Sequence, residues 1–102
     1  VRLGQYEFGD DQQASTSAHA KDYFTKGTVH AVEGRWVLAI EDLTKAISAD
    51  PRYVAAYLNR GVAFEAADEA DRAIQDHDKV VQHNPNYAKA YLNRGNAYRR
   101  LG

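Results

Sequence analysis

Residues 56–61 read AYLNRG, and the same six letters recur at residues 90–95, a step of 34 positions. The same step links Pro51 to Pro85, and it places Tyr23 one period before the tyrosine of the first copy. A fixed period of this size is typical of repeat proteins, in which each unit buries its apolar face by stacking on its neighbour. The sequence therefore predicts an array of short repeated units.

The spacing inside each unit is helical. Tyr57, Gly61 and Phe64 are separated by four and then three positions, which places them on one face of a helix. A second stripe follows in each unit: Ala39, Ile40, Leu43, Ala46 and Ile47, then Ala73, Ile74, His77, Val80 and Val81. The two prolines disfavour helical geometry just before them and are expected to end these second helices. The predicted helices span about 20–33, 36–49, 54–67, 71–83 and 88–101.

A helix-turn-helix unit of this length resembles the tetratricopeptide repeat. The residues that carry the resemblance are an aromatic ring in the first helix, a small residue four positions later, an alanine in the second helix and a terminal proline. They are Tyr23, Tyr57 and Tyr91; Gly27, Gly61 and Gly95; Ala39 and Ala73; Pro51 and Pro85. The resemblance implies an all-α fold, a right-handed α-solenoid of stacked helix-turn-helix repeats.

The resemblance also implies how the chain is divided. Residues 20–53 and 54–87 form two complete repeats, and 88–102 form the first helix of a third repeat or a capping helix. Residues 1–19 lie outside the pattern, carry a polar stretch, and are expected to form a flexible tail. The chain departs from the family pattern at three positions. His30 replaces a ring of the first helix, His77 replaces a large apolar residue of the second helix, and Asp68 replaces the turn glycine.

The resemblance implies a function in binding, because the first helices of such arrays line a concave groove that contacts the ligand. We expect a protein–protein interaction module that binds a peptide or protein segment there. The residues predicted to line the groove are Phe24, Thr28, Leu58, Asn59, Val62, Lys89, Leu92, Asn93, Asn96, Arg99 and Arg100. Asparagine offers a donor and an acceptor, so Asn59 and Asn93 either pair with the backbone of an extended peptide or hydrogen-bond within the array.

The basic residues of the predicted last helix favour an acidic partner, because arginine pairs well with carboxylates. Some tetratricopeptide domains clamp the terminal carboxylate of heat-shock chaperones through five positions. Asn59 and Lys89 match that set, whereas Phe24, Thr28 and Asn93 stand at the other three positions. Two matches of five do not predict this clamp.

Composition limits the other classes of function. Lys and Arg number 13 and Asp and Glu 14, so the net charge of -1 gives no basis for expecting a nucleic-acid partner. We expect no membrane span, because no apolar run is long enough. There is no cysteine, which excludes disulfides and leaves the compartment open, with a cytoplasmic location slightly favoured.

No residue pattern points to catalysis, a metal or a cofactor, so we expect a protein that is not an enzyme. His77 lies between Asp76 and Asp78, but successive helical side chains point about 100 degrees apart and do not converge on a metal. The alternative to a binding module is a structural scaffold that self-associates through its open repeat ends. The uncovered side of the predicted last helix, with Tyr91, Ala97, Tyr98 and Leu101, would then pair two chains as a homo-oligomer.

Overall fold

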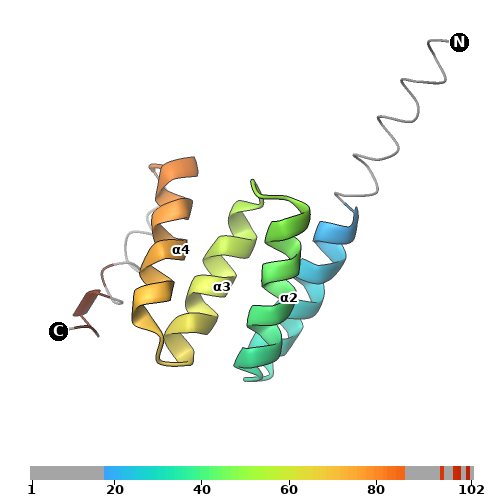
Figure 1. Cartoon of the computed structure of the whole chain (residues 1–102), viewed down its shortest axis with the longest axis horizontal. Helices are drawn as coiled ribbons and strands as arrows, with labels where there is room; N and C mark the ends of the chain where they lie inside the picture. Colours follow the sequence, from blue (N-terminus) through green and yellow to red (C-terminus); the bar gives the residue numbers. More distant parts are fainter. Residues whose placement is uncertain (1–17, 87–94, 96–97, 100, 102) are drawn as a thin grey trace, which may run out of the picture.

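The computed structural model describes residues 18–86, 95, 98–99 and 101 (Figure 1). A helix over 18–32 is followed by α2 (Trp36–Ala49), α3 (Val54–Ala66) and α4 (Ala70–His83). The first four predicted helices are thus confirmed to within two residues at each end. Residues 95, 98–99 and 101 are also helical, while the rest of the predicted helix 88–101 lies outside the described residues.

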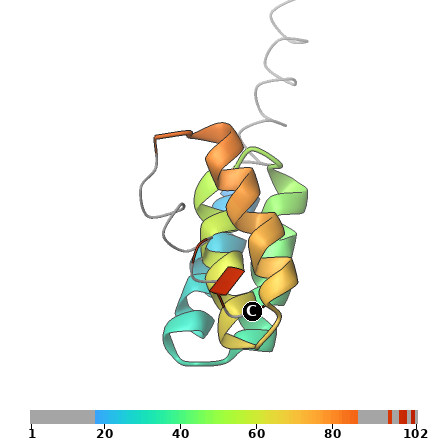
Figure 2. The ribbon, with the colours of Figure 1, turned by 90° about the vertical axis from the view of Figure 1, so that its left-hand side faces the viewer.

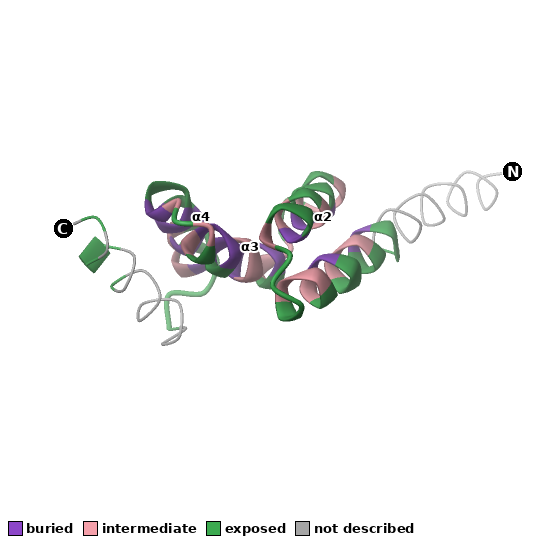
Figure 3. Ribbon diagram, turned by 90° about the horizontal axis from the view of Figure 1, so that it is seen from below, coloured by how far each residue is buried: buried purple, intermediate pink, exposed green. Residues whose placement is uncertain are grey.

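The helices stack as two helix-turn-helix units. The helix over 18–32 and α2 form the first unit, and α3 and α4 form the second. α3 packs against both α2 and α4. Figure 3 shows two rows, with the first helix and α3 in one row and α2 and α4 in the other. Figure 2, which looks along the array from the α4 end, shows α4 (orange) in front of α3 and α2. The all-α, tetratricopeptide-like arrangement expected from the sequence is therefore confirmed.

The polar tail predicted over 1–19 ends earlier than expected, because the first helix begins at residue 18. Residues 18 and 19 already belong to the first helix, and residues 1–17 lie outside the described part of the chain. Helix formation is cooperative, so a helix extends beyond its apolar stripe wherever the next residues allow helical geometry. The repeat pattern marks where packing begins, which is two residues later.

The turn inside each unit uses the same hydrogen-bond motif with a different residue. In the first unit, Gly34 has a φ of 76° and the amide of Arg35 donates to the carbonyl of His30 at 2.8 Å. In the second unit, Asp68 has a φ of 64° and the amide of Glu69 donates to the carbonyl of Phe64 at 2.8 Å. This is a Schellman ending, which needs a left-handed residue. Aspartate tolerates that conformation better than most side chains, so the second unit turns without glycine.

The core forms where small residues let two helices approach. Leu43 of α2 is fully buried and lies beneath Gly27 of the first helix. His77 of α4 is fully buried and lies beneath Gly61 of α3. A Cβ atom added at either glycine would come within 3.0 Å of the side chain below it. The predicted packing role of both glycines follows from these distances, because protein interiors leave no spare room.

We expect Gly61→Ala to lower the free energy of unfolding by about 1–2 kcal/mol. The added Cβ would lie 2.5 Å from Cε1 of His77, and overpacking of this kind outweighs the better helix propensity of alanine. Urea unfolding of the variant measures the effect. The double variant Gly61→Ala/His77→Ala should recover stability relative to Gly61→Ala alone, because the clash is removed. A single variant as stable as the parent would show that the ring can move aside.

Candidate functional site

A small hollow opens between the first helix and α3, at the end of the groove near the turn that leads into α2. Its volume is about 260 Å³. Its lining is mostly apolar and contains no charged side chain: Thr28, Ala31, Val32, Trp36, Asn59 and Val62. Val32 is 84% exposed and Val62 is also exposed, although both are aliphatic. Exposed apolar side chains grouped around a concave site are typical of a surface that binds a partner.

Two polar side chains join the two walls of this hollow. Nδ2 of Asn59 donates a hydrogen bond to Oγ1 of Thr28 at 3.0 Å, so α3 and the first helix are tied together there. This contact is the hydrogen bond within the array that was one of the two interpretations of Asn59. Both side chains can still hydrogen-bond to a ligand, because the amide oxygen of Asn59 can accept a hydrogen bond and the hydroxyl of Thr28 can donate one.

Phe24 and Leu58, two apolar residues predicted to line the groove, pack within the array instead. Phe24 is half-buried and stacks on Tyr53, with ring centroids 4.9 Å apart and planes 22° apart. Burial raises the pKa of Tyr53, and the nearby Asp50 carboxylate adds to the rise. Leu58 is only 8% exposed and packs in a core cluster with Val80 of α4. Leu58 is therefore a core residue, although the repeat register assigned it to the groove.

The C-terminal part of the predicted site falls mostly outside the described residues. Lys89, Leu92, Asn93, Asn96 and Arg100 are in that group. Arg99 is described, lies in a helix, is exposed and takes part in an interaction. The described structure thus brings together Thr28, Asn59 and Val62.

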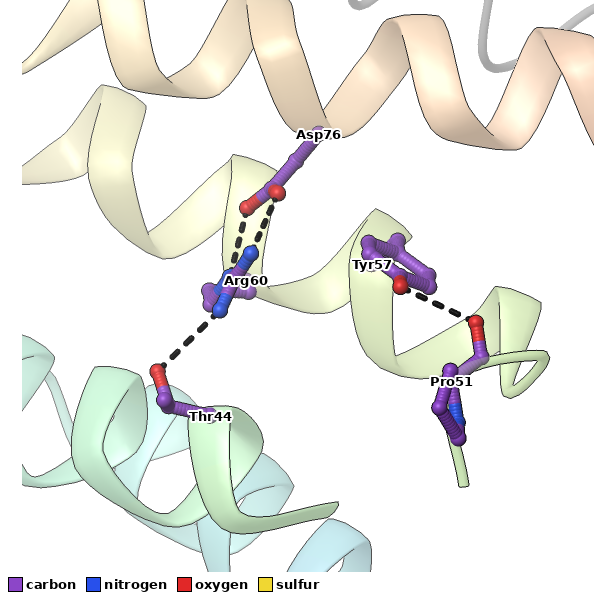
Figure 4. A network of polar contacts seen from close by, with 5 residues as sticks. All are labelled: Thr44, Pro51, Tyr57, Arg60 and Asp76. Carbon is purple, nitrogen blue, oxygen red and sulfur yellow. Dashed lines mark hydrogen bonds and ion pairs between the residues drawn. The ribbon is translucent and has the colours of Figure 1, made fainter. Parts of the chain in front are cut away.

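The back of α3 is fixed by Arg60, the residue next to Asn59. Nε and Nη2 of Arg60 donate to the two carboxylate oxygens of Asp76 at 2.8 and 2.7 Å, and Nη1 donates to Oγ1 of Thr44 at 3.2 Å (Figure 4). The hydrogen bonds to Asp76 raise the pKa of Arg60 above its ordinary value, which is already high. One side chain of α3 thereby joins α2 and α4. The part of α3 that carries Asn59 and Val62 is therefore held in position before a ligand binds. A site that is already ordered loses less conformational entropy on binding.

Tyr57 supports the same helix at its beginning. Its hydroxyl donates to the carbonyl of Pro51 at 2.9 Å, across the turn between the two units (Figure 4). The bond fixes the entry of α3 relative to the end of α2. A buried tyrosine hydroxyl usually finds such a partner.

Three lining residues were not predicted from the sequence: Ala31, Val32 and Trp36. Val32 lies one helical turn after Thr28, so its place on the same face could have been read from the register. Trp36 begins α2, and its position in the hollow depends on the path of the turn at Gly34. That path has no signal in the repeat pattern.

The described residues offer no metal site or membrane span. In residues 18–86, 95, 98–99 and 101, no three His, Cys, Asp or Glu side chains are grouped as metal ligands. Asp76, one of the acidic neighbours of His77, is committed to Arg60. Within the same part of the chain, no helix has the length and apolar character needed to cross a membrane.

No family model matches the chain, and no curated protein matches it. Solved structures do match. The first tetratricopeptide domain of Spaghetti (RPAP3), bound to the HSP90 peptide SRMEEVD, is 32% identical with a TM-score of 0.80. That match covers 83% of this chain and 68% of the other.

Two further solved structures agree in fold. The second tetratricopeptide domain of Spaghetti (RPAP3), bound to the same peptide, is 27% identical with a TM-score of 0.85, and the match covers 90% of this chain and 84% of that one. The OM64 tetratricopeptide domain from Arabidopsis is 28% identical with a TM-score of 0.82, over 84% of this chain and 71% of that one. The similarity extends over both described units.

Proposed function

The chain belongs to the tetratricopeptide repeat family, and we propose that it holds an extended protein segment in the groove between its first helix and α3. The observation that carries the proposal is the uncharged hollow lined by Trp36, Val62 and the Thr28–Asn59 pair. Two of the solved structures that this chain resembles, the two Spaghetti (RPAP3) domains, are bound to a peptide. Tetratricopeptide domains are typically interaction modules rather than enzymes.

The size of the hollow supports a side chain as its occupant. Pockets that bury a drug-sized ligand have volumes of about 300–1,000 Å³. The hollow, at about 260 Å³, is smaller than these pockets. An aliphatic or aromatic side chain placed there would bury the exposed faces of Val32 and Val62 and the ring of Trp36. The apolar area removed from water would stabilise the complex by about 25 cal/mol per Å².

The polar pair would hold the backbone of the same segment. The carbonyl of Asn59 can accept from a peptide N–H, and the hydroxyl of Thr28 can donate to a peptide carbonyl. These contacts do not depend on the peptide side chains, so they favour an extended backbone in general. The apolar hollow then supplies the preference for particular sequences.

The groove differs from a carboxylate clamp in its first unit. Where the clamp pattern has lysine and asparagine, this chain has Phe24, which stacks on Tyr53, and Thr28, which bonds Asn59. We therefore propose that the anchor of the bound segment is an apolar side chain rather than a terminal carboxylate. The preference for an acidic segment stays a prediction, because Lys89 and Arg100 lie outside the described residues.

Binding of linear peptides tests the proposal. Peptides are selected from a random display library on the intact chain, and their affinities are measured by calorimetry beside SRMEEVD. We expect Val62→Asp to weaken binding at least about tenfold, because a carboxylate in the hollow loses solvation when the anchor enters. We expect Asn59→Ala to weaken it about fivefold, through one lost hydrogen bond. SRMEEVD should bind more weakly than peptides with an apolar centre.

The matched control is Val37→Asp. Val37 is an exposed valine of α2 that does not line the hollow, so the same change there should leave affinity unaltered. Melting temperatures of all variants separate lost binding from lost folding. Equal losses for Val37→Asp and Val62→Asp would contradict a groove site, as would tight binding of SRMEEVD that depends on its final carboxylate.

Self-association is the second candidate function. Tyr98 and Leu101, two large apolar side chains near the end of the chain, are exposed. Pairing of two chains through them would cover this surface. Sedimentation at increasing concentration tests it, with Tyr98→Ser/Leu101→Ser as the variant. A clean monomer of the parent chain at high concentration removes this candidate.

A further inference from the structure

His77 occupies a fully buried position that is apolar in the other unit. It lies in α4 directly beneath Gly61 of α3, with 0% of its surface exposed. Neither ring nitrogen has a hydrogen-bond partner. In the first unit the equivalent residue, 34 positions earlier, is Leu43, which is also fully buried and lies beneath Gly27. The two units therefore share one packing arrangement, but only the second has a titratable group in it.

The charged groups that act on the ring come from two helices. On α3, Oε2 of Glu65 is 3.6 Å from Nε2 of His77, which is beyond hydrogen-bond distance. On α4 itself, Asp76 and Asp78 flank the ring in sequence, and Asp76 is bound by Arg60 of α3. Burial lowers the pKa of His77, although Glu65, Asp76 and Asp78 act to raise it. The net effect favours the neutral form of the ring in the packed state.

The space around the ring is too tight for a charged form to be solvated in place. The backbone of Gly61 is so close that even an added Cβ would lie 2.5 Å from the ring. An imidazolium needs hydrogen-bond acceptors on both nitrogens, and in the packed state it has none. Water can reach the ring nitrogens only if α4 moves away from α3, because the ring is fully buried, and Glu65 at 3.6 Å does not reach hydrogen-bond distance in the packed state.

We propose that His77 makes the second unit proton-sensitive, so that uptake of one proton by its ring loosens α4 from α3. The first unit stays packed, since Leu43 fills the equivalent space. The device is selective in its location, because only the second unit has a titratable ring in the space beneath its glycine. It requires no ligand and is separate from the function proposed above.

The direction of the pH effect follows from linkage. The ordinary histidine pKa of about 6.5 applies to the unfolded chain, and the folded value is lower. The contribution of neutral His77 to stability is therefore complete above about pH 6.5, and it is lost as the pH falls from there through the folded pKa. Each unit between the two values changes the folding equilibrium constant by up to about tenfold.

Urea unfolding at about pH 7.5 and about pH 5.5 tests the proposal, because histidines are the side chains that ordinarily titrate in this interval. We compare the parent chain with His77→Leu, which copies the first unit, and with His19→Gln, which changes an exposed histidine. The parent and His19→Gln should lose stability together on acidification, and His77→Leu should lose clearly less. An equal loss in His77→Leu would overturn the proposal.

A second measurement does not depend on any variant. NMR titration of the His77 ring in the parent chain should give a pKa below about 6.5. Amide protection on acidification should fall in α4 (Ala70–His83) more than in α2 (Trp36–Ala49). A ring that titrates at or above the ordinary value, or a uniform loss of protection over both units, would contradict a device located at His77.

The consequence for the groove rests on the proposed function. Asn59 and Val62 lie on α3, so loosening of the second unit should weaken peptide binding at about pH 5.5 in the parent more than in His77→Leu. The groove proposal and the His77 proposal can be contradicted independently of each other. Absence of peptide binding at both pH values contradicts the groove, while the stability difference still decides the role of His77.

Discussion

Replacing Asp76 by alanine is expected to lower the free energy of unfolding by about 3 kcal/mol, because it leaves Arg60 without its carboxylate inside the array. The Asp76 side chain is only 4% exposed and that of Arg60 is 19% exposed. Breaking a buried pair costs about 3–5 kcal/mol, and the partial exposure of Arg60 favours the lower end. The loss would also weaken one polar contact between α3 and α2, since the pairing with Asp76 positions Nη1 of Arg60 for its hydrogen bond to Thr44.

An exposed ion pair at the beginning of α4 supplies the control. Arg72 and Glu69 are 3.7 Å apart with both side chains largely exposed, so Glu69→Ala should cost less than about 1 kcal/mol. The double variant Arg60→Met/Asp76→Leu should recover much of the loss, because apolar residues remove the unpaired charge. Urea unfolding measures all three. Equal, small effects for Asp76→Ala and Glu69→Ala would show that the pair contributes nothing beyond a surface contact.

Replacing Leu43 by alanine is expected to destabilise the fold by about 3 kcal/mol. Leu43 is the residue beneath Gly27, is fully buried, and lies in a cluster with Ala39 and Ala46. Removing a buried leucine side chain costs its transfer free energy plus the cost of the cavity, about 2–5 kcal/mol in total. The other buried members of this cluster are alanines, which cannot extend into the vacated space, so any relaxation must come from the partly buried side chains around it.

Leu38→Ala is the matched change on the same helix. Leu38 is exposed, so its loss should cost less than about 1 kcal/mol. Denaturant midpoints of both variants, compared at equal m-values, give the difference. If Leu43→Ala and Leu38→Ala were equally stable, the space beneath Gly27 would not be the centre of the first unit.

The fold could be predicted because the same helical pattern occurs in more than one copy along the chain. The period of 34, the stripes on each second helix and the terminal prolines all agree, and the described helices follow them closely. The positive φ of Asp68 could be expected as well, since Gly34 stands one period earlier. Repetition tests each assignment against a second copy of the same unit.

The site was harder to predict, because it depends on which faces neighbouring helices cover. Thr28, Asn59 and Val62 line the hollow, but Leu58 is buried in a core cluster that includes Val80 of α4. The pairing of Arg60 with Asp76 joins two helices of one unit and has no counterpart in local spacing. Trp36 lines the hollow because the turn at Gly34 sets the position where α2 begins. Such contacts follow from packing between elements, which a single sequence does not specify.

The most direct test of the groove is amide chemical-shift mapping of the chain on titration with a selected peptide. The proposal predicts that the largest shifts fall at residues 28–32, at the indole of Trp36 and at residues 59–62, around the hollow. Shifts confined to the exposed face of α4, at Gln75, Lys79 and Gln82, with the hollow unchanged, would contradict it.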